Sequence, residues 1–209
     1  REKSLKDIIT SGKIPITRLL TVFRHEQASL ISLNASRITN GEFLDLLPYY
    51  EGEKDFYCIF REEVEDIEKE ILSLCSSRLK KRYGFDPVRD IQILTPMRKG
   101  LIGTENLNSR LQETLNPKYS RDGHKGGMDV GDKVMQIRNN YDKEVFNGDL
   151  GIVSSVDSEE GSLEVSFEGR KVLYETADLG EVVLAYAITV HKSQGSEFPC
   201  VIIPSPTTH

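Results

Sequence analysis

Ten consecutive residues near the end of the chain, TVHKSQGSEF from Thr189 to Phe198, combine hydroxyl, imidazole, ammonium, amide and carboxylate groups. Hydroxyl, ammonium and backbone N–H groups donate hydrogen bonds to phosphate oxygens, and cationic groups attract anionic ligands. The stretch lies between two apolar runs, VVLAYAI and CVIIP, so the sequence predicts a polar loop that connects two strands. A solvated turn is the simple alternative, and the rest of the chain has to decide between the two.

Two further polar clusters follow apolar runs. Arg24 and His25 come after IPITRLLTVF, and the segment MRKGLIG, which contains Arg98 and Lys99, follows IQILTP. Ligands of open α/β sheets bind outside the carboxyl ends of the strands, so parallel strands would bring these clusters to one edge with the segment 191–197. Each cluster by itself is also consistent with solvated surface charges. Together they would surround one groove with cationic groups, hydroxyls and backbone amides, which suits phosphates.

Most of the chain alternates between predicted strands and helices, which indicates an α/β fold with a parallel sheet. The apolar runs predict buried strands at 14–23, 56–60, 91–96, 184–190 and 200–204. Helical spacing predicts helices that end at Gly41, that cover 62–83, and that start from a cap at Thr104. The second helix has acidic residues at its start and basic residues at its end, followed by Gly84, as the helix dipole and a glycine C-cap favour.

From about Tyr119 the pattern changes to that of a small all-β unit. The stretch SRDGHKGG has the composition of a linker, and short strands separated by Asn-Gly and Glu-Gly turns follow it. These strands are VGDKVMQI, NGDLGIVSSV, SLEVSF and RKVLYET. Because the buried-strand pattern then returns in LAYAITV, the β unit is predicted to be an insertion. The predicted boundaries are 1–120 and 185–209 for the two parts of the α/β domain and 121–184 for the insertion.

Length and composition set the class of protein. A chain of 209 residues with 38% hydrophobic content can bury one domain or slightly more. Its 27 basic and 33 acidic residues give a net charge of -6, which argues against coating nucleic acid through bulk positive charge but allows local basic patches. The cysteines Cys58, Cys75 and Cys200 predict neither a disulfide framework nor a zinc site. We expect a reducing, cytoplasmic setting and no membrane partner, because no targeting signal or membrane-spanning run is visible.

Four blocks of the sequence resemble the second motor domain of the RecD-like helicases of superfamily 1, the group that contains the exodeoxyribonuclease V alpha subunit. The blocks, in the order of that family, are LTVFRHE, ILTPMRKGLIGTENLN, GDKVMQIRNNYDKEVFNGDLGIV and AYAITVHKSQGSEFPCVIIP. The resemblance runs in register from Ser4 to Pro204. It implies a RecA-like parallel-sheet domain that carries an inserted SH3-like β-barrel.

The resemblance also implies roles for the polar clusters. Arg24 matches the family's arginine that reaches the γ-phosphate of ATP, where it would act catalytically as an arginine finger. Gly195 and Glu197 would lie toward the bound nucleotide, and His25 stands where the family commonly has glutamine. The residues implied to bind single-stranded DNA are Arg98, Lys99, Thr189, His191, Lys192 and Ser193.

Two groups that such a motor needs do not occur in this sequence. There is no G-x-x-x-x-G-K-[ST] stretch for the phosphates of ATP and no strand that ends in Asp-Glu to hold Mg²⁺. We therefore expect a fragment of an ATP-dependent 5′ to 3′ DNA helicase that acts in DNA repair or recombination, inactive alone, with ATP and Mg²⁺ bound only in the full-length protein. Its expected partners are single-stranded DNA and the first motor domain of the same chain, with nuclease-complex subunits left open. The alternative is a non-catalytic, helicase-derived module that binds DNA or a protein.

Overall fold

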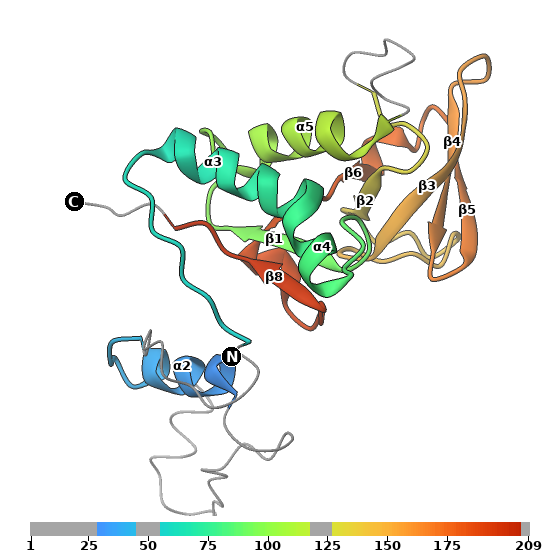
Figure 1. Cartoon of the computed structure of the whole chain (residues 1–209). Coiled ribbons are helices and arrows are strands. Elements are labelled where there is room, and N and C mark those ends of the chain that lie inside the picture. Colours follow the sequence, from blue (N-terminus) through green and yellow to red (C-terminus); the bar gives the residue numbers. More distant parts are fainter. Residues whose placement is uncertain (1–28, 45–54, 118–126, 206–209) are drawn as a thin grey trace, which may run out of the picture. The chain divides into compact units, whose positions relative to one another are not determined.

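The computed structural model describes residues 29–44, 55–117 and 127–205 (Figure 1). The chain divides into two units, Arg1–Phe60 and Arg61–His209, and each unit is described by itself. The predicted strand at 14–23 lies outside the described residues, as do Arg24 and His25.

In the first unit, helix α2 (Leu30–Thr39) begins at a serine cap. The Ser29 hydroxyl accepts a hydrogen bond from the backbone N–H of Ser32 and donates one to the Asp55 carboxylate over 2.6 Å. At the other end Asn40 caps the helix, and Gly41 takes a left-handed φ of +73°. The helix therefore ends where the sequence predicted.

The predicted buried strand at 56–60 is wrong. These residues form no strand, and the side chains of Tyr57 and Phe60 are 53% and 71% exposed. A buried strand needs hydrogen-bonding partners along its edges as well as an apolar run. Among the described residues the parallel sheet consists of three other strands, so the apolar run FYCIF was not a sufficient signal.

In the second unit, the helix predicted over 62–83 is present as three consecutive pieces. These are α3 (Val64–Ser73), a π-helical turn (Leu74–Arg78) and α4 (Leu79–Tyr83). Gly84 ends the segment with a φ of +76°. The charges at both ends confirm the predicted match to the helix dipole, whereas the π turn had no signal in the periodicity.

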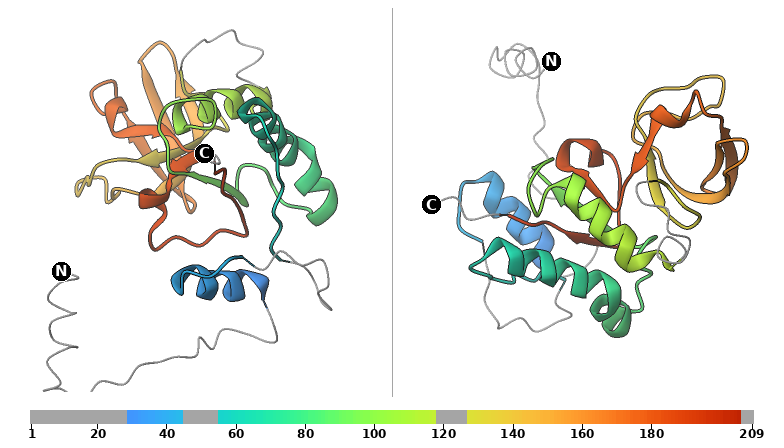
Figure 2. Two further views of the ribbon diagram at one scale, coloured as in Figure 1. Left: turned by 90° about the vertical axis from the view of Figure 1, so that its left-hand side faces the viewer. Right: turned by 90° about the horizontal axis from the view of Figure 1, so that it is seen from above.

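The parallel sheet has β1 (Ile91–Thr95) at its centre, with β7 (Ala187–Thr189) on one side and β8 (Cys200–Ile202) on the other. Helix α5 (Thr104–Leu115) and the α3–α4 segment lie together on one face of this sheet (Figures 1 and 2). The N-cap of α5 is Gly103 and not Thr104 as predicted, because the chain enters the helix directly from a tight loop.

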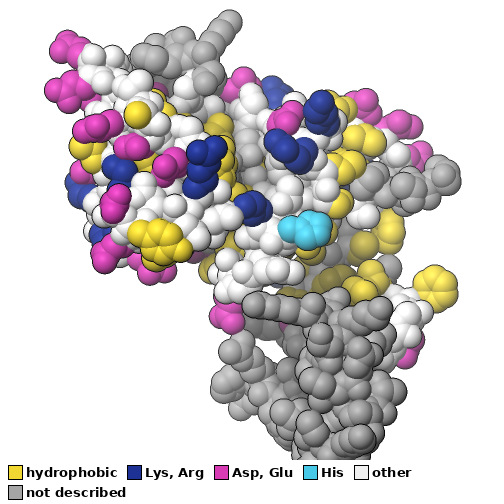
Figure 3. Space-filling model, turned by 180° about the vertical axis from the view of Figure 1, so that it is seen from behind, with side chains coloured by type: hydrophobic (Ala, Val, Ile, Leu, Met, Phe, Trp, Pro, Cys, Tyr) yellow, Lys and Arg dark blue, Asp and Glu magenta, His cyan; other side chains and the backbone are white. Residues whose placement is uncertain are grey.

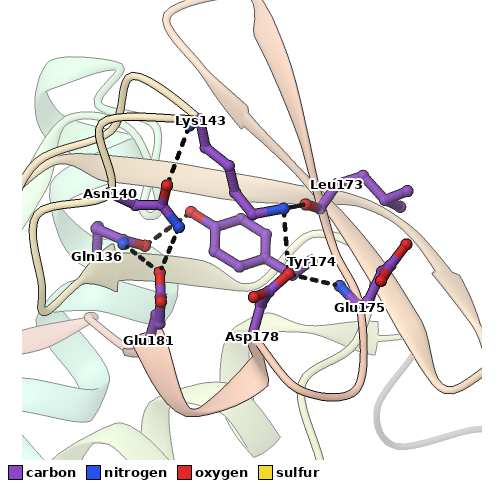
Figure 4. A network of polar contacts seen from close by, with 8 residues as sticks. All are labelled: Gln136, Asn140, Lys143, Leu173, Tyr174, Glu175, Asp178 and Glu181. Atoms are coloured by element: carbon purple, nitrogen blue, oxygen red, sulfur yellow. Dashed lines mark hydrogen bonds and ion pairs between the residues drawn. The ribbon is translucent and has the colours of Figure 1, made fainter.

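Four of the predicted β strands are confirmed and a fifth joins them. The antiparallel sheet has the order β5-β4-β3-β2-β6. Its strands are β2 (Lys133–Gln136), β3 (Leu150–Asp157), β4 (Ser162–Phe167), β5 (Arg170–Tyr174) and β6 (Val182–Leu184). No ladder joins β5 to β6 in this sheet. Tyr174 of β5 nevertheless donates a hydrogen bond to Gln136 of β2 over 2.8 Å, so the sheet curls enough to bring these two strands together (Figure 4).

The apolar run VVLAYAI, which predicted one strand, is divided between the two sheets. Its first part forms β6 and its last part forms β7, with Ala185 and Tyr186 between them. Buried amide side chains satisfy the backbone at this crossing: Gln92 donates to the carbonyls of both intervening residues over 3.1 Å. Asn108 of α5 donates to the carbonyl of Ala187 and accepts from its N–H. Periodicity could not show the division, because both strands are buried.

The apolar core follows the same division. One cluster lies between the helices and the parallel sheet and a second fills the β unit. A third, smaller cluster joins them through Met135, Ala185 and Ile188, with Phe198 packed against it. The loop that follows β7 therefore ends against residues from both sheets.

Candidate functional site

Two of the three predicted polar clusters start at the same edge of the parallel sheet. Thr95 ends β1 and Thr189 ends β7, and the two are register partners. The loop 97–103 and the 3-10 turn Val190–Ser193 consequently leave the sheet side by side. This confirms the expectation that parallel strands bring these two clusters together. The third cluster, Arg24 and His25, lies outside the described residues.

The loop after β1 is closed by its own hydrogen bonds. Thr95 donates its hydroxyl hydrogen to the carbonyl of Ile102 over 2.9 Å, and the N–H of Thr104 donates to Met97 over 3.0 Å. A Cβ on Gly103 would lie 2.4 Å from the carbonyl oxygen of Lys99, so only glycine fits there. The closed loop presents Arg98 and Lys99 to solvent. The Arg98 guanidinium is 3.9 Å from Glu105, with 79% of its side chain exposed, so solvent screens this pair strongly.

The loop after β7 has fewer internal bonds. The Ser193 hydroxyl donates to the carbonyl of Val190 over 2.7 Å, and the N–H of Ser196 donates to Ser193 over 3.0 Å. Gly195 lies inside the turn that this second bond closes, and its φ of +85° is a left-handed conformation that glycine adopts without strain. His191 and Glu197 are exposed and Thr189 is half-buried. His191 therefore faces solvent at the edge of the sheet, where a ligand could reach it.

Lys192, another predicted DNA-binding residue, contacts the β unit. Its ammonium donates a hydrogen bond of 2.7 Å to Oδ1 of Asn147, which belongs to the β unit. An ammonium has three donors, so this bond leaves capacity for a phosphate. Sequence reasoning did not identify Asn147, because it lies in an Asn-Gly stretch that was interpreted only as a turn signal.

Lys133 is a second residue that the sequence did not single out. It lies at the start of β2 with 5% of its surface exposed, and its Nζ donates to the carbonyl of Ile91 in β1 over 3.1 Å. The same ammonium lies 5.7 Å from the centroid of the Phe198 ring. Desolvation lowers the pKa of Lys133 to about 8, against the opposing attraction of the carboxylates of Asp90 and Asp86. The signal in the sequence was a lysine directly before the apolar pair Val134 and Met135.

Asp132, beside it, is a fully buried carboxylate with four hydrogen-bond donors. These are Nε2 of Gln112, Nδ2 of Asn116, the N–H of Asp129 and the hydroxyl of Tyr186, at 2.6 to 2.8 Å. Burial and then the charge of Asp132 raise the pKa of Tyr186, so its hydroxyl stays a donor. Two of the donors lie at the end of α5, so Asp132 attaches the β unit to that helix.

Basic side chains gather on one face of the molecule. Figure 3 shows several Lys and Arg side chains above and to one side of a histidine, with acidic side chains among them and beyond them. This local grouping exists although the whole chain carries a net charge of -6. In the described part of the chain no group of three His, Cys, Asp or Glu side chains could hold a metal ion. Nor does that part contain a helix long and apolar enough to cross a membrane.

A hollow of about 500 Å³ lies elsewhere, between α5 and strands β3 and β4. Gln112, Met128 and Leu163 are among its lining residues. None of the predicted site residues lines it, so the polar edge of the parallel sheet remains the candidate site.

Comparison with known protein families agrees with the resemblance seen in the sequence. Residues 107–167 match the family model of the ATP-dependent RecD-like DNA helicase SH3 domain, and residues 184–209 match that of the UvrD-like helicase C-terminal domain. The first match begins inside α5, earlier than the insertion boundary predicted at 121. The chain is therefore similar to the RecD-like DNA helicases over these segments.

Several curated relatives carry RecD names. The chain is 41% identical over 119 residues to the ATP-dependent RecD2 DNA helicase of Deinococcus radiodurans, a match that covers 54% of this chain and 16% of that protein. It is 27% identical over 164 residues to the RecBCD enzyme subunit RecD of Haemophilus influenzae, covering 72% of this chain and 23% of the subunit. The chain thus spans only a minor part of the length of these relatives.

Among solved structures, the fold is similar to that of a Pif1 helicase from Bacteroides in complex with ADP-AlF3 and ssDNA. The TM-score is 0.52 at 18% identity, and the match covers 92% of this chain and 46% of the Pif1 chain. At this identity the likeness concerns the fold alone. It agrees with the predicted α/β fold class.

Proposed function

We propose that this chain is a second motor domain segment of an ATP-dependent DNA helicase of the RecD type, which moves 5′ to 3′ and acts in DNA repair or recombination. The observation that carries the proposal is the register pairing of Thr95 with Thr189. It brings Arg98, Lys99 and His191 to one edge of the sheet, in a chain whose relatives are RecD helicases. For the β unit we propose an SH3-like barrel that is closed by side chains such as Tyr174 rather than by a ladder.

The proposed DNA contacts follow from the chemistry of the exposed groups. Arg98 and Lys99 would supply positive charge from a closed loop, and His191 and the Thr189 hydroxyl would supply donors beside it. The Ser193 hydroxyl would have to exchange its bond to the carbonyl of Val190 for one to a phosphate. Lys192 would add a phosphate contact with its remaining donors. Contacts of this kind position a phosphate backbone without reading bases, so binding should weaken as salt rises.

The proposed nucleotide contacts involve Gly195, Glu197 and Arg24. Arg24 would stabilise the negative charge that develops on the transferred phosphoryl group, as an arginine finger does. The residues of this chain do not fit Mg²⁺, since no suitable cluster occurs in the described parts and the sequence lacks the Asp-Glu strand end. We assign the phosphate loop and the Mg²⁺ ligands to a first motor domain of the same protein.

The test is ATP hydrolysis by the full-length protein, with and without single-stranded DNA. We expect DNA to stimulate hydrolysis, and Arg24→Ala to lower the rate by roughly a thousandfold while DNA affinity changes little. Normal hydrolysis by the Arg24→Ala variant would reject the role of Arg24. Wild-type protein that binds single-stranded DNA without hydrolysing ATP would reject the helicase and support a binding module.

A further inference from the structure

The β unit contacts both ends of the loop that follows β7. At the start of the loop, Lys192 donates a hydrogen bond to Asn147 over 2.7 Å. At its end, the ring of Phe198 lies 5.7 Å from the ammonium of Lys133. Asn147 and Lys133 both belong to the β unit, so one neighbour reaches the loop at two separate points.

The segment that carries Asn147 is held by the polar network in Figure 4. Asn140 and Gln136 donate side-chain hydrogen bonds of 3.1 and 2.9 Å to the same carboxylate oxygen of Glu181. Asn140 also accepts from the backbone N–H of Lys143 over 3.0 Å. The backbone N–H of Asn147 itself donates to Oδ1 of Asn139 over 2.9 Å, so the backbone of Asn147 is fixed by a bond within the β unit.

The backbone of Lys133 is fixed in a similar way. Lys133 pairs with Ile152 in the ladder between β2 and β3, and its carbonyl accepts from the N–H of Ala185 over 2.8 Å. From this fixed backbone the side chain extends into the interior, toward the carbonyl of Ile91 and the ring of Phe198. A buried ammonium needs such partners, because it has lost its hydration.

We propose that Lys133 is a positioning residue for the loop 190–199, and that the β unit fixes this loop on the parallel sheet through Lys133 and Asn147. Strands β7 and β8 are both parallel to β1 and lie on opposite sides of it, so the loop has to cross from the carboxyl edge to the amino edge. Lys192 is held where the crossing starts and Phe198 where it ends. The inference concerns the position of the loop, and only its consequence for ligand binding rests on the proposed function.

Hydrogen–deuterium exchange of the 209-residue chain tests the proposal with Lys133→Met, which keeps the apolar stem and removes the ammonium. We expect the amides of the loop, including that of Ser196, to exchange roughly tenfold faster. Lys171→Met is the matched control, since Lys171 lies in the same β unit with 64% of its side chain exposed and pairs with Glu164. The control should leave exchange in the loop unchanged.

A double-mutant cycle with Phe198→Leu isolates the contact itself. If the two residues act through one another, Lys133→Met should add little to the exchange rate in the Phe198→Leu background. Additive effects, or unchanged loop exchange in folded Lys133→Met, would overturn the proposal. Should Lys133→Met fail to fold, Phe198→Leu and Asn147→Ala still have to accelerate exchange at the two ends of the loop. Single-stranded DNA binding by the wild type, measured alongside, tests the proposed function separately.

Discussion

The two loops at the carboxyl edge of the parallel sheet are held in different ways. The loop 97–103 closes on itself, with bonds from Thr95 to Ile102 and from the N–H of Thr104 to Met97. The loop 190–199 has few bonds of its own and contacts the β unit at both ends.

This difference suits the two loops to different tasks at the carboxyl edge of the sheet. A loop that closes on itself presents cationic groups in a constant position, which suits a backbone contact without sequence preference. A loop held by a second structural unit changes its position when that unit or its contacts change. If the proposed function is correct, the second loop is the one suited to couple the DNA and nucleotide sites.

The largest expected effect tests whether the first loop is closed by its own packing. A Cβ at position 103 would lie 2.4 Å from the carbonyl oxygen of Lys99 and 2.6 Å from that of Arg98. Gly103→Ala should therefore lower the free energy of unfolding by on the order of 3 kcal/mol or more, measured by urea denaturation.

Gly195→Ala is the matched change in the second loop. Nothing lies within 4 Å of a Cβ there, and the φ of +85° alone is unfavourable for alanine. We expect a cost of about 1 to 2 kcal/mol. Equal effects at the two glycines would mean that the loops do not differ in packing.

A further effect on stability, spread over a range of pH, concerns the dependence of the second loop on Lys133. The folded-state pKa of Lys133 is lowered to about 8 from its ordinary value of 10.5, so the unfolded chain binds more protons between these pH values. The contribution of this group to stability should rise through that window, by on the order of 3 kcal/mol in total. The carboxylates of Asp86 and Asp90 oppose the shift, and Cys75, whose pKa is raised to about 12 chiefly by burial, stays neutral there.

Urea denaturation of wild type and Lys133→Met at pH 7 to 10 measures this contribution. The stability of the wild type relative to the variant should increase as the pH rises from 8. Parallel curves for the two proteins would show that the ammonium is not buried, and that the second loop is held in some other way.

The sequence predicted the first loop better than the second. The strand 91–95, the helix of α5 and the polar segment between them follow from local patterns, and their bonds join residues close in sequence. The contacts of the second loop join Lys192 to Asn147 and Phe198 to Lys133, residues 45 and more positions apart, which no periodicity reveals. The prediction of a single strand in VVLAYAI was wrong because β6 and β7 are both apolar and buried, so the local pattern does not show that they belong to two sheets. The roles of Arg98, His191, Glu197 and Arg24 came from the resemblance and stay predictions.

The smallest expected effect on stability is that of His191→Ala, which tests whether the second loop binds DNA at all. His191 is exposed in the 3-10 turn, so His191→Ala should change the melting temperature little. In the full-length protein, ATP hydrolysis without DNA should stay nearly intact, while the DNA concentration needed for half-stimulation should rise. The loss of one hydrogen bond to a charged phosphate corresponds to about 1.5 to 3 kcal/mol, on the order of a tenfold to hundredfold shift. His191→Gln keeps a donor and should restore much of the loss. A lowered melting temperature with an unshifted stimulation curve would assign His191 to the fold, and the DNA contacts would then lie on the self-closed loop alone.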